Sequence, residues 1–191
     1  MDLQGWGADR PIFERLLTEV RPDVVIEVGV WKGASLLRMH ELAHELGLHT
    51  EFIAVDTWLG SAEHWLGAKD RARLGLRGGY PDLYRQFVFN LLELGADDVF
   101  PLPMTSTAAA RVLRELGVRA DLVYVDAGHE EEEVSADLAN YSTLLSPAGV
   151  MFGDDYHSDW PGLVRAVDDF ARVHSSALER EGRVWVIHRS R

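Results

Sequence analysis

Two spacings of apolar residues alternate along the chain, and they predict alternating strands and helices. Short apolar, β-branched runs are typical of buried strands, and they occupy residues 24–28, 52–56, 99–104, 121–125 and 150–153. Apolar positions three or four residues apart predict helices over residues 11–20, 34–46, 81–94, 108–116, 130–145 and 161–174. This alternation predicts a doubly wound, Rossmann-like α/β fold with a mainly parallel sheet.

The end of the chain departs from this alternation. Residues 177–180 and 183–188 flank Glu181-Gly182 and predict an antiparallel hairpin, which brings the expected sheet to seven strands. Pro101 and Pro103 place the third strand at an edge of the sheet. Because no linker, repeat or low-complexity segment interrupts the pattern, residues 1–191 are expected to form a single domain.

Residues 57–79 have little periodicity and are rich in Gly, Trp and Arg. They follow a predicted strand end, where active-site loops are common. We interpret this segment as a lid or substrate loop that carries Trp58, His64 and Trp65. The alternative is a solvated excursion whose aromatic side chains anchor in the core.

Composition excludes several classes of protein. A formal net charge of -12 argues against nucleic acid or an anionic membrane as a partner. No apolar run reaches the length of a membrane span, and the first residues lack the features of a signal peptide. The absence of cysteine excludes disulfides, thiolate metal sites and a cysteine nucleophile, and fits a cytoplasmic location.

The first predicted strand and its turn suggest a cofactor site. Gly29 and Gly33 follow the strand and precede a helix, the arrangement that cradles nucleotides in doubly wound folds. Asp56 ends the second strand, where an acid accepts hydrogen bonds from ribose hydroxyls. The turn reads Glu-x-Gly-x-x-x-Gly, which differs from the dinucleotide motif and favours an adenosine cofactor without phosphates. A purely structural turn, with Asp56 as a cap, is the alternative.

Three carboxylates and a histidine follow the fourth and fifth strands. Asp126 and His129 come after the fourth strand, and Asp154 and Asp155 come after the fifth. Parallel strands end at the same edge of a sheet, so these groups are expected to meet and to bind a divalent cation. The alternatives are a helix cap, a loop carboxylate and a structural histidine. A histidine beside such a cation can act as a general base. His129 is the candidate, and His157 is close enough in sequence to take its place.

These motifs resemble a known family. Residues 25–35, Val-Ile-Glu-Val-Gly-Val-Trp-Lys-Gly-Ala-Ser, are similar to the first motif of class I S-adenosylmethionine-dependent methyltransferases. Residues 125–129, 153–156 and 160–162 narrow the resemblance to the metal-dependent O-methyltransferases of antibiotic biosynthesis, the macrolide-sugar and cephalosporin-pathway group. That group often carries extra N-terminal segments, which this chain has hardly any of.

The resemblance implies roles for individual residues. Those assigned to S-adenosylmethionine are Glu27, Gly29, Gly33, Asp56, Ser106 and Asp126. Those assigned to magnesium are Asp126, Asp154 and Asp155, and His129 is the implied general base. For Ser106, helix capping is the competing role.

The sequence therefore predicts a magnesium-dependent O-methyltransferase. A hard dication held by carboxylates can lower the pKa of a bound hydroxyl, and a nearby imidazole can accept its proton. The expected acceptor is a small hydroxylated metabolite such as a sugar, a diol or a phenol, and a homo-oligomer is possible. The alternatives are a nicotinamide-dependent oxidoreductase and a cofactor-binding protein without catalysis.

Overall fold

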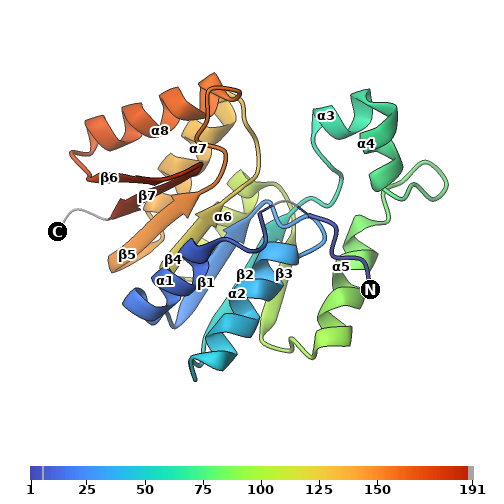
Figure 1. The fold of residues 1–191 in the computed structure, drawn as a ribbon, viewed down its shortest axis with the longest axis horizontal. Coiled ribbons are helices and arrows are strands. Elements are labelled where there is room, and N and C mark those ends of the chain that lie inside the picture. The colour runs from blue at the N-terminus through green and yellow to red at the C-terminus, as the bar shows by residue number, and fades with distance from the viewer. Residues whose placement is uncertain (6, 189–191) are drawn as a thin grey trace.

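One seven-stranded sheet forms the centre of the molecule (Figure 1). The computed structural model describes residues 1–5 and 7–188. The strands are β1 (Val24–Val28), β2 (Glu51–Asp56), β3 (Val99–Pro103), β4 (Ala120–Val125), β5 (Leu145–Gly153), β6 (Leu178–Glu181) and β7 (Val184–His188). Their order is β3-β2-β1-β4-β5-β7-β6, with β7 antiparallel to both neighbours and the other pairs parallel. The predicted fold, its hairpin and the edge position of β3 are confirmed.

Two layers of helices cover the sheet. One apolar core joins it to α1 (Pro11–Val20), α2 (Ala34–Glu45) and α5 (Leu83–Leu94). The other core joins it to α6 (Ser106–Glu115), α7 (Glu131–Ser142) and α8 (Pro161–Val173). Neighbouring strand residues such as Val25 and Ile26 enter different cores, because successive side chains in a strand point to opposite faces.

The region expected to be irregular contains two short helices, α3 (Ala62–Leu66) and α4 (Ala68–Arg73). Figure 1 shows them projecting beyond the end of the sheet, above α5. Trp58 is buried and stacks on Phe87 at 4.9 Å, so the alternative of an aromatic anchor in the core is correct for this residue. Trp65 is exposed instead.

Two predicted boundaries are wrong. The crossover helix α7 ends at Ser142 instead of residue 145, and β5 begins at Leu145 instead of residue 150. The pairing of β4 with β5 shifts register between Ala120 and Leu122, which accommodates these extra residues. On α5, Tyr84 and Leu92 are exposed. No helix among the described residues is long and apolar enough to cross a membrane.

Candidate active site

The strand register brings the predicted site residues to one edge of the sheet. Val28 of β1 pairs with Val55 of β2 and with Val125 of β4, and Val125 pairs with Gly153 of β5. The residues that directly follow Val28, Val55, Val125 and Gly153 therefore lie at the same level. Those residues are Gly29, Asp56, Asp126 and Asp154. This edge is the carboxyl edge, where open α/β sheets bind ligands.

Gly29 allows the turn after β1 to pass close to the end of β4. Its φ is 92°, and an added Cβ would lie 2.1 Å from the carbonyl oxygen of Asp126. Gly33 has a φ of 89°, and its Cβ would lie 2.9 Å from the ring of Phe87. Both glycines are therefore required by the backbone and by protein contacts at this turn.

Glu27 is fully buried in the middle of this arrangement. Its Oε1 accepts a hydrogen bond of 2.6 Å from the Ser35 hydroxyl, whereas its Oε2 is buried without a hydrogen-bond partner. Burial raises the pKa of Glu27 well above its ordinary value, and the Ser35 hydrogen bond opposes that rise. An unpaired buried oxygen is costly, so this carboxyl is prepared for a donor that enters the site.

Asp56 is occupied by the backbone of the neighbouring turns. Its carboxylate accepts hydrogen bonds from the N–H of Trp31 at 2.8 Å and from the N–H of Trp58 at 2.6 Å. Burial raises the pKa of Asp56, and these backbone N–H groups oppose the rise. Each carboxylate oxygen keeps a second lone-pair direction, so a ribose contact remains compatible with this geometry.

Ser106 is the first residue of α6, and Thr105 caps that helix by accepting from the Ala108 N–H. The Ser106 carbonyl accepts from the Tyr141 hydroxyl at 2.9 Å. Burial raises the pKa of Asp137 to about 6, and a hydrogen bond from Ser106 opposes that rise. Ser106 therefore has protein partners through both its carbonyl and its hydroxyl.

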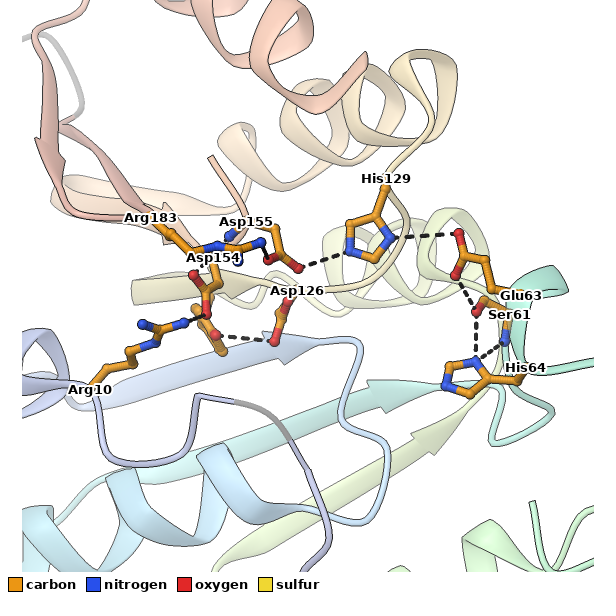
Figure 2. Close-up of polar contacts among 10 residues, drawn as sticks. Arg10, Ser61, Glu63, His64, Asp126, His129, Asp154, Asp155 and Arg183 are labelled. Atoms are coloured by element: carbon orange, nitrogen blue, oxygen red, sulfur yellow. Dashed lines mark hydrogen bonds and ion pairs between the residues drawn. The ribbon is translucent and has the colours of Figure 1, made fainter. Parts of the chain in front are cut away.

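The three aspartates are held by two arginines from distant parts of the chain and by one tyrosine close in sequence (Figure 2). Asp154 pairs with Arg10, which lies immediately before α1. Asp155 accepts from Arg183, in the turn between β6 and β7, at 2.7 Å. Asp126 accepts from the hydroxyl of Tyr124 at 3.1 Å. Two arginines thus neutralise two of the three carboxylates.

Asp126 is the least compensated of the three. Burial, followed by repulsion from Asp154 and Asp155, raises its pKa to about 7, although Tyr124 and His129 oppose this rise. A carboxyl that ionises near neutral pH between two other carboxylates marks a site with excess negative charge. A bound cation would relieve this repulsion.

His129 is the histidine that reaches the acids. Its Nε2 lies 3.0 Å from Asp155, and its ring stacks on Trp160 at 3.9 Å. Burial alone would lower the pKa of His129, but the hydrogen bond and charge of Asp155, with Glu63, outweigh burial and raise it. His157 is exposed and pairs with Asp159 at 3.1 Å.

The distances between the acids bear on metal binding. Magnesium takes oxygen ligands at about 2.0–2.1 Å, so any two of them lie within roughly 4.2 Å of each other. Among the described residues, the three predicted acids do not form a group whose ligand atoms all lie within 4.8 Å of one another. His40, His44 and Asp98 do form such a group. Ligation by all three therefore requires their side chains to rotate.

Sequence reasoning missed several residues of this site. Tyr124 lies two positions before Asp126, and the two-residue period of a strand could have placed both on one side. Glu63, 3.8 Å from Nδ1 of His129, comes from α3, which the pattern did not predict. Arg10 and Arg183 carry no local signal, because only the folded chain brings them to the acids.

The chain matches the family model described as a methyltransferase domain over residues 26–156, well over half of its length. The chain belongs to this methyltransferase family. The matched region contains the glycine turn, Asp56 and the three aspartates. The resemblance to class I methyltransferases is therefore confirmed.

Solved structures agree with this methyltransferase assignment. The calicheamicin methyltransferase CalS11 superimposes with a TM-score of 0.69 at 18% identity, over 93% of this chain and 76% of that one. The O-methyltransferase NovP superimposes with a TM-score of 0.68 at 18% identity, over 94% of this chain and 78% of that one. An O-methyltransferase from Bacillus cereus in complex with SAH superimposes with a TM-score of 0.63 at 12% identity, over 93% of this chain and 79% of that one. At these identities the likeness establishes a shared fold. A search of curated protein sequences gave no significant match.

Proposed function

We propose that this methyltransferase transfers a methyl group from S-adenosylmethionine to a hydroxyl of a small metabolite, with help from a divalent cation. The single observation that carries the proposal is the common edge shared by the glycine turn, Asp56 and the three aspartates. A methyl donor and an acceptor oxygen held side by side at this edge would satisfy the main requirement of methyl transfer, which is alignment.

The residues at the edge fit the cofactor. The buried, unpartnered Oε2 of Glu27 is suited to a donor such as an ammonium group. Asp56 has lone pairs left for ribose hydroxyls, and Ser106 and Asp126 are assigned to the cofactor on the resemblance alone. S-adenosylmethionine supplies the methyl group when it is bound. The B. cereus relative is described in complex with SAH, the demethylated product.

The donor chemistry also fits a hard divalent cation. Three carboxylates at the ends of β4 and β5 form an all-oxygen ligand set, which favours Mg²⁺ over softer metals. Asp126, Asp154 and Asp155 would hold it once Arg10 leaves Asp154. A bound dication supplies positive charge that lowers the pKa of an acceptor hydroxyl.

His129 is the proposed base. Its Nε2 faces Asp155, so an N–H at this position leaves Nδ1 as the proton acceptor. Nδ1 is buried without a hydrogen-bond partner, and stacking on Trp160 fixes the plane of the ring. Asp155 and Arg183 hold His129 in this orientation.

The proposed acceptor is a sugar, a diol or a phenol-like compound. One relative, CalS11, is described as a TDP-rhamnose 3'-O-methyltransferase, and another, NovP, as an O-methyltransferase. Two adjacent hydroxyls could both reach a cation at the carboxyl edge, which favours a vicinal diol or catechol. One domain would carry the whole activity, and the cytoplasmic location stays a prediction.

Cofactor binding tests the first step of the proposal. Calorimetric titration of the metal-free protein with S-adenosylhomocysteine is expected to give one site per chain, and Glu27→Gln is expected to weaken it. NAD serves as the comparison ligand. Tight binding of NAD with no binding of S-adenosylhomocysteine would favour the oxidoreductase instead.

Turnover tests the second step. A panel of sugars, diols and catechols with labelled S-adenosylmethionine is expected to give a methylated product that requires Mg²⁺ and disappears in EDTA. Full turnover in EDTA would contradict the cation. Cofactor binding that is intact in Asp126→Ala, with no acceptor methylated by the native chain, would favour the non-catalytic binding protein.

A further inference from the structure

We propose that His40, His44 and Asp98 form a second metal site, which takes a transition metal of the zinc class and serves the structure of the protein. The ligand atoms of these three residues all lie within 4.8 Å of one another. None of the three belongs to the proposed active site. The inference depends on the geometry of this cluster and is independent of methyl transfer.

The three residues come from two segments that the fold holds together. His40 and His44 are four residues apart on α2, so they lie on the same face of the helix, one turn apart. Asp98 lies in the connection between α5 and β3. The Asp98 carbonyl accepts from the N–H of Phe52 at 3.1 Å, which ties this connection to the start of β2.

The distances fit a metal with short bonds. Nε2 of His40 lies 2.6 Å from Oδ1 of Asp98, and Nε2 of His44 lies 3.8 Å from Oδ2. Zinc binds imidazole nitrogen and carboxylate oxygen at about 2.0–2.2 Å, so neighbouring ligand atoms in a tetrahedral site lie roughly 3.3 Å apart. The two observed distances bracket this value, so small side-chain movements would complete the site.

The burial of the ligands differs, and it leaves one side of the site open to solvent. The His40 side chain is 9% exposed and its ring lies against Phe52, with 5.6 Å between centroids, so its rotamer is fixed by packing. His44 is 65% exposed and Asp98 is 40% exposed. Solvent therefore supplies the remaining coordination position, and ions have direct access.

The ligand types separate this site from the proposed magnesium site. Two imidazoles and one carboxylate favour zinc, copper, nickel or cobalt, whereas an all-carboxylate set favours magnesium. The two sites also lie at opposite ends of α2. The helix begins at Ala34, beside the glycine turn, and reaches His40 and His44 in its second half.

Zinc titration of the tag-free protein tests the proposal. Calorimetry with ZnCl2 is expected to give one zinc per chain at this site. Zinc at a hundredfold excess over the dissociation constant is expected to raise Tm by roughly 5 to 10 °C, because the ion binds the folded state. His44→Ala is expected to weaken zinc at least about tenfold. It is the preferred variant because His44 is exposed, so its loss spares the core.

Two control variants distinguish this site from other binding. His49→Ala removes an exposed histidine just beyond α2 that is outside the cluster, and it is expected to bind zinc as the native chain does. Asp126→Asn removes an acid at the carboxyl edge, and it is also expected to leave this zinc site intact. Equal zinc affinity in native protein and His44→Ala would overturn the proposal. So would loss of zinc binding in Asp126→Asn, which would place the ion at the carboxyl edge.

Discussion

Each end of the sheet pairs a histidine with an aspartate, but the surroundings of the two pairs differ. At the carboxyl edge, Nε2 of His129 lies 3.0 Å from Asp155, and two further aspartates and two arginines surround the pair. At the amino end, Nε2 of His40 lies 2.6 Å from Asp98, and a second histidine lies beside it. The first site brings three carboxylates and two arginines together, whereas the second has two imidazoles and one carboxylate, with the His40 ring fixed by packing. Charge density therefore suits one site to chemistry and the other to structure.

Exchange of one carboxylate for an amide at each end of the sheet is expected to give the largest difference in kcat/KM between the two sites. Asp126→Asn removes a ligand of the proposed cation, so kcat/KM is expected to fall about 100- to 1,000-fold. Asp98→Asn makes the same chemical change at the amino end and is expected to keep kcat/KM within about twofold. Steady-state kinetics in saturating Mg²⁺ checks both. Equal losses in the two variants would remove the distinction between the ends.

The same Asp126→Asn substitution is expected to destabilise the protein at low pH and to stabilise it at high pH. The folded state raises the pKa of Asp126 to about 7 from an ordinary value of 3.8. The resulting stabilisation is complete below about pH 4 and disappears as pH rises through 7, because the folded state holds the proton longer. Since the side chain is only half-buried, the expected change is roughly 1–3 kcal/mol rather than the full shift.

Urea unfolding in EDTA at pH 4.5 and pH 8 measures this effect. The native chain is expected to lose stability relative to Asp126→Asn as pH rises, and to be the less stable protein at pH 8. The difference between the two proteins cancels the groups that titrate alike in both. A difference that stays constant with pH would show that folding does not raise the pKa of Asp126.

Arg10 is the cation that the carboxyl edge already contains. An added Cβ at Gly7 would lie 2.8 Å from Oδ2 of Asp154, so the segment before Arg10 lies directly against this carboxylate. Because Arg10 and a divalent ion would compete for Asp154, Arg10→Ala is expected to tighten Mg²⁺ binding about three- to tenfold. Titration of Mg²⁺ against Tm and against turnover measures this change.

Arg15→Ala is the matched control for Arg10→Ala. Arg15 pairs with Glu179 at 3.3 Å and Glu181 at 3.7 Å, away from the proposed site, and its loss is expected to leave Mg²⁺ binding unchanged. Weaker Mg²⁺ binding in Arg10→Ala would mean that Arg10 orients Asp154 instead of competing for it. The carboxyl edge would then resemble the amino end, with ligands held in place before the ion arrives.

The sequence predicted the parts of both regions that depend on neighbours in the chain. Strand runs fixed the sheet, and strand ends placed Asp56, Asp126 and Asp154 on one edge, because parallel register follows from local pattern. The arginines that pair with Asp154 and Asp155 could not be predicted. Arg10 meets Asp154 across 144 residues, through a loop whose path depends on packing rather than on periodicity.

The amino-end cluster shows the same limit. The spacing of His40 and His44 on a helix is visible in the sequence, but the third ligand is 58 residues from His40. Likewise, α3 and α4 have no clear apolar period, because none of their residues is buried. A pattern that depends on burial predicts poorly where helices project from the sheet, and Glu63 was missed for this reason.

Glu63 offers the smallest and most specific test of the carboxyl edge. Its Oε1 lies 3.8 Å from Nδ1 of His129, and its charge helps to raise the pKa of His129. His129 must be neutral to accept a proton, so activity is expected to rise with pH as this imidazole loses its charge. Glu63→Gln removes one of the charges that favour the imidazolium, and the rising limb of kcat/KM is expected to move to lower pH. Glu132→Gln, an exposed acid on α7 that makes the same change in net charge, is expected to leave that limb in place. A limb that stays fixed in Glu63→Gln would mean that α3 does not reach the base during turnover, and the contact would then belong to the resting protein alone.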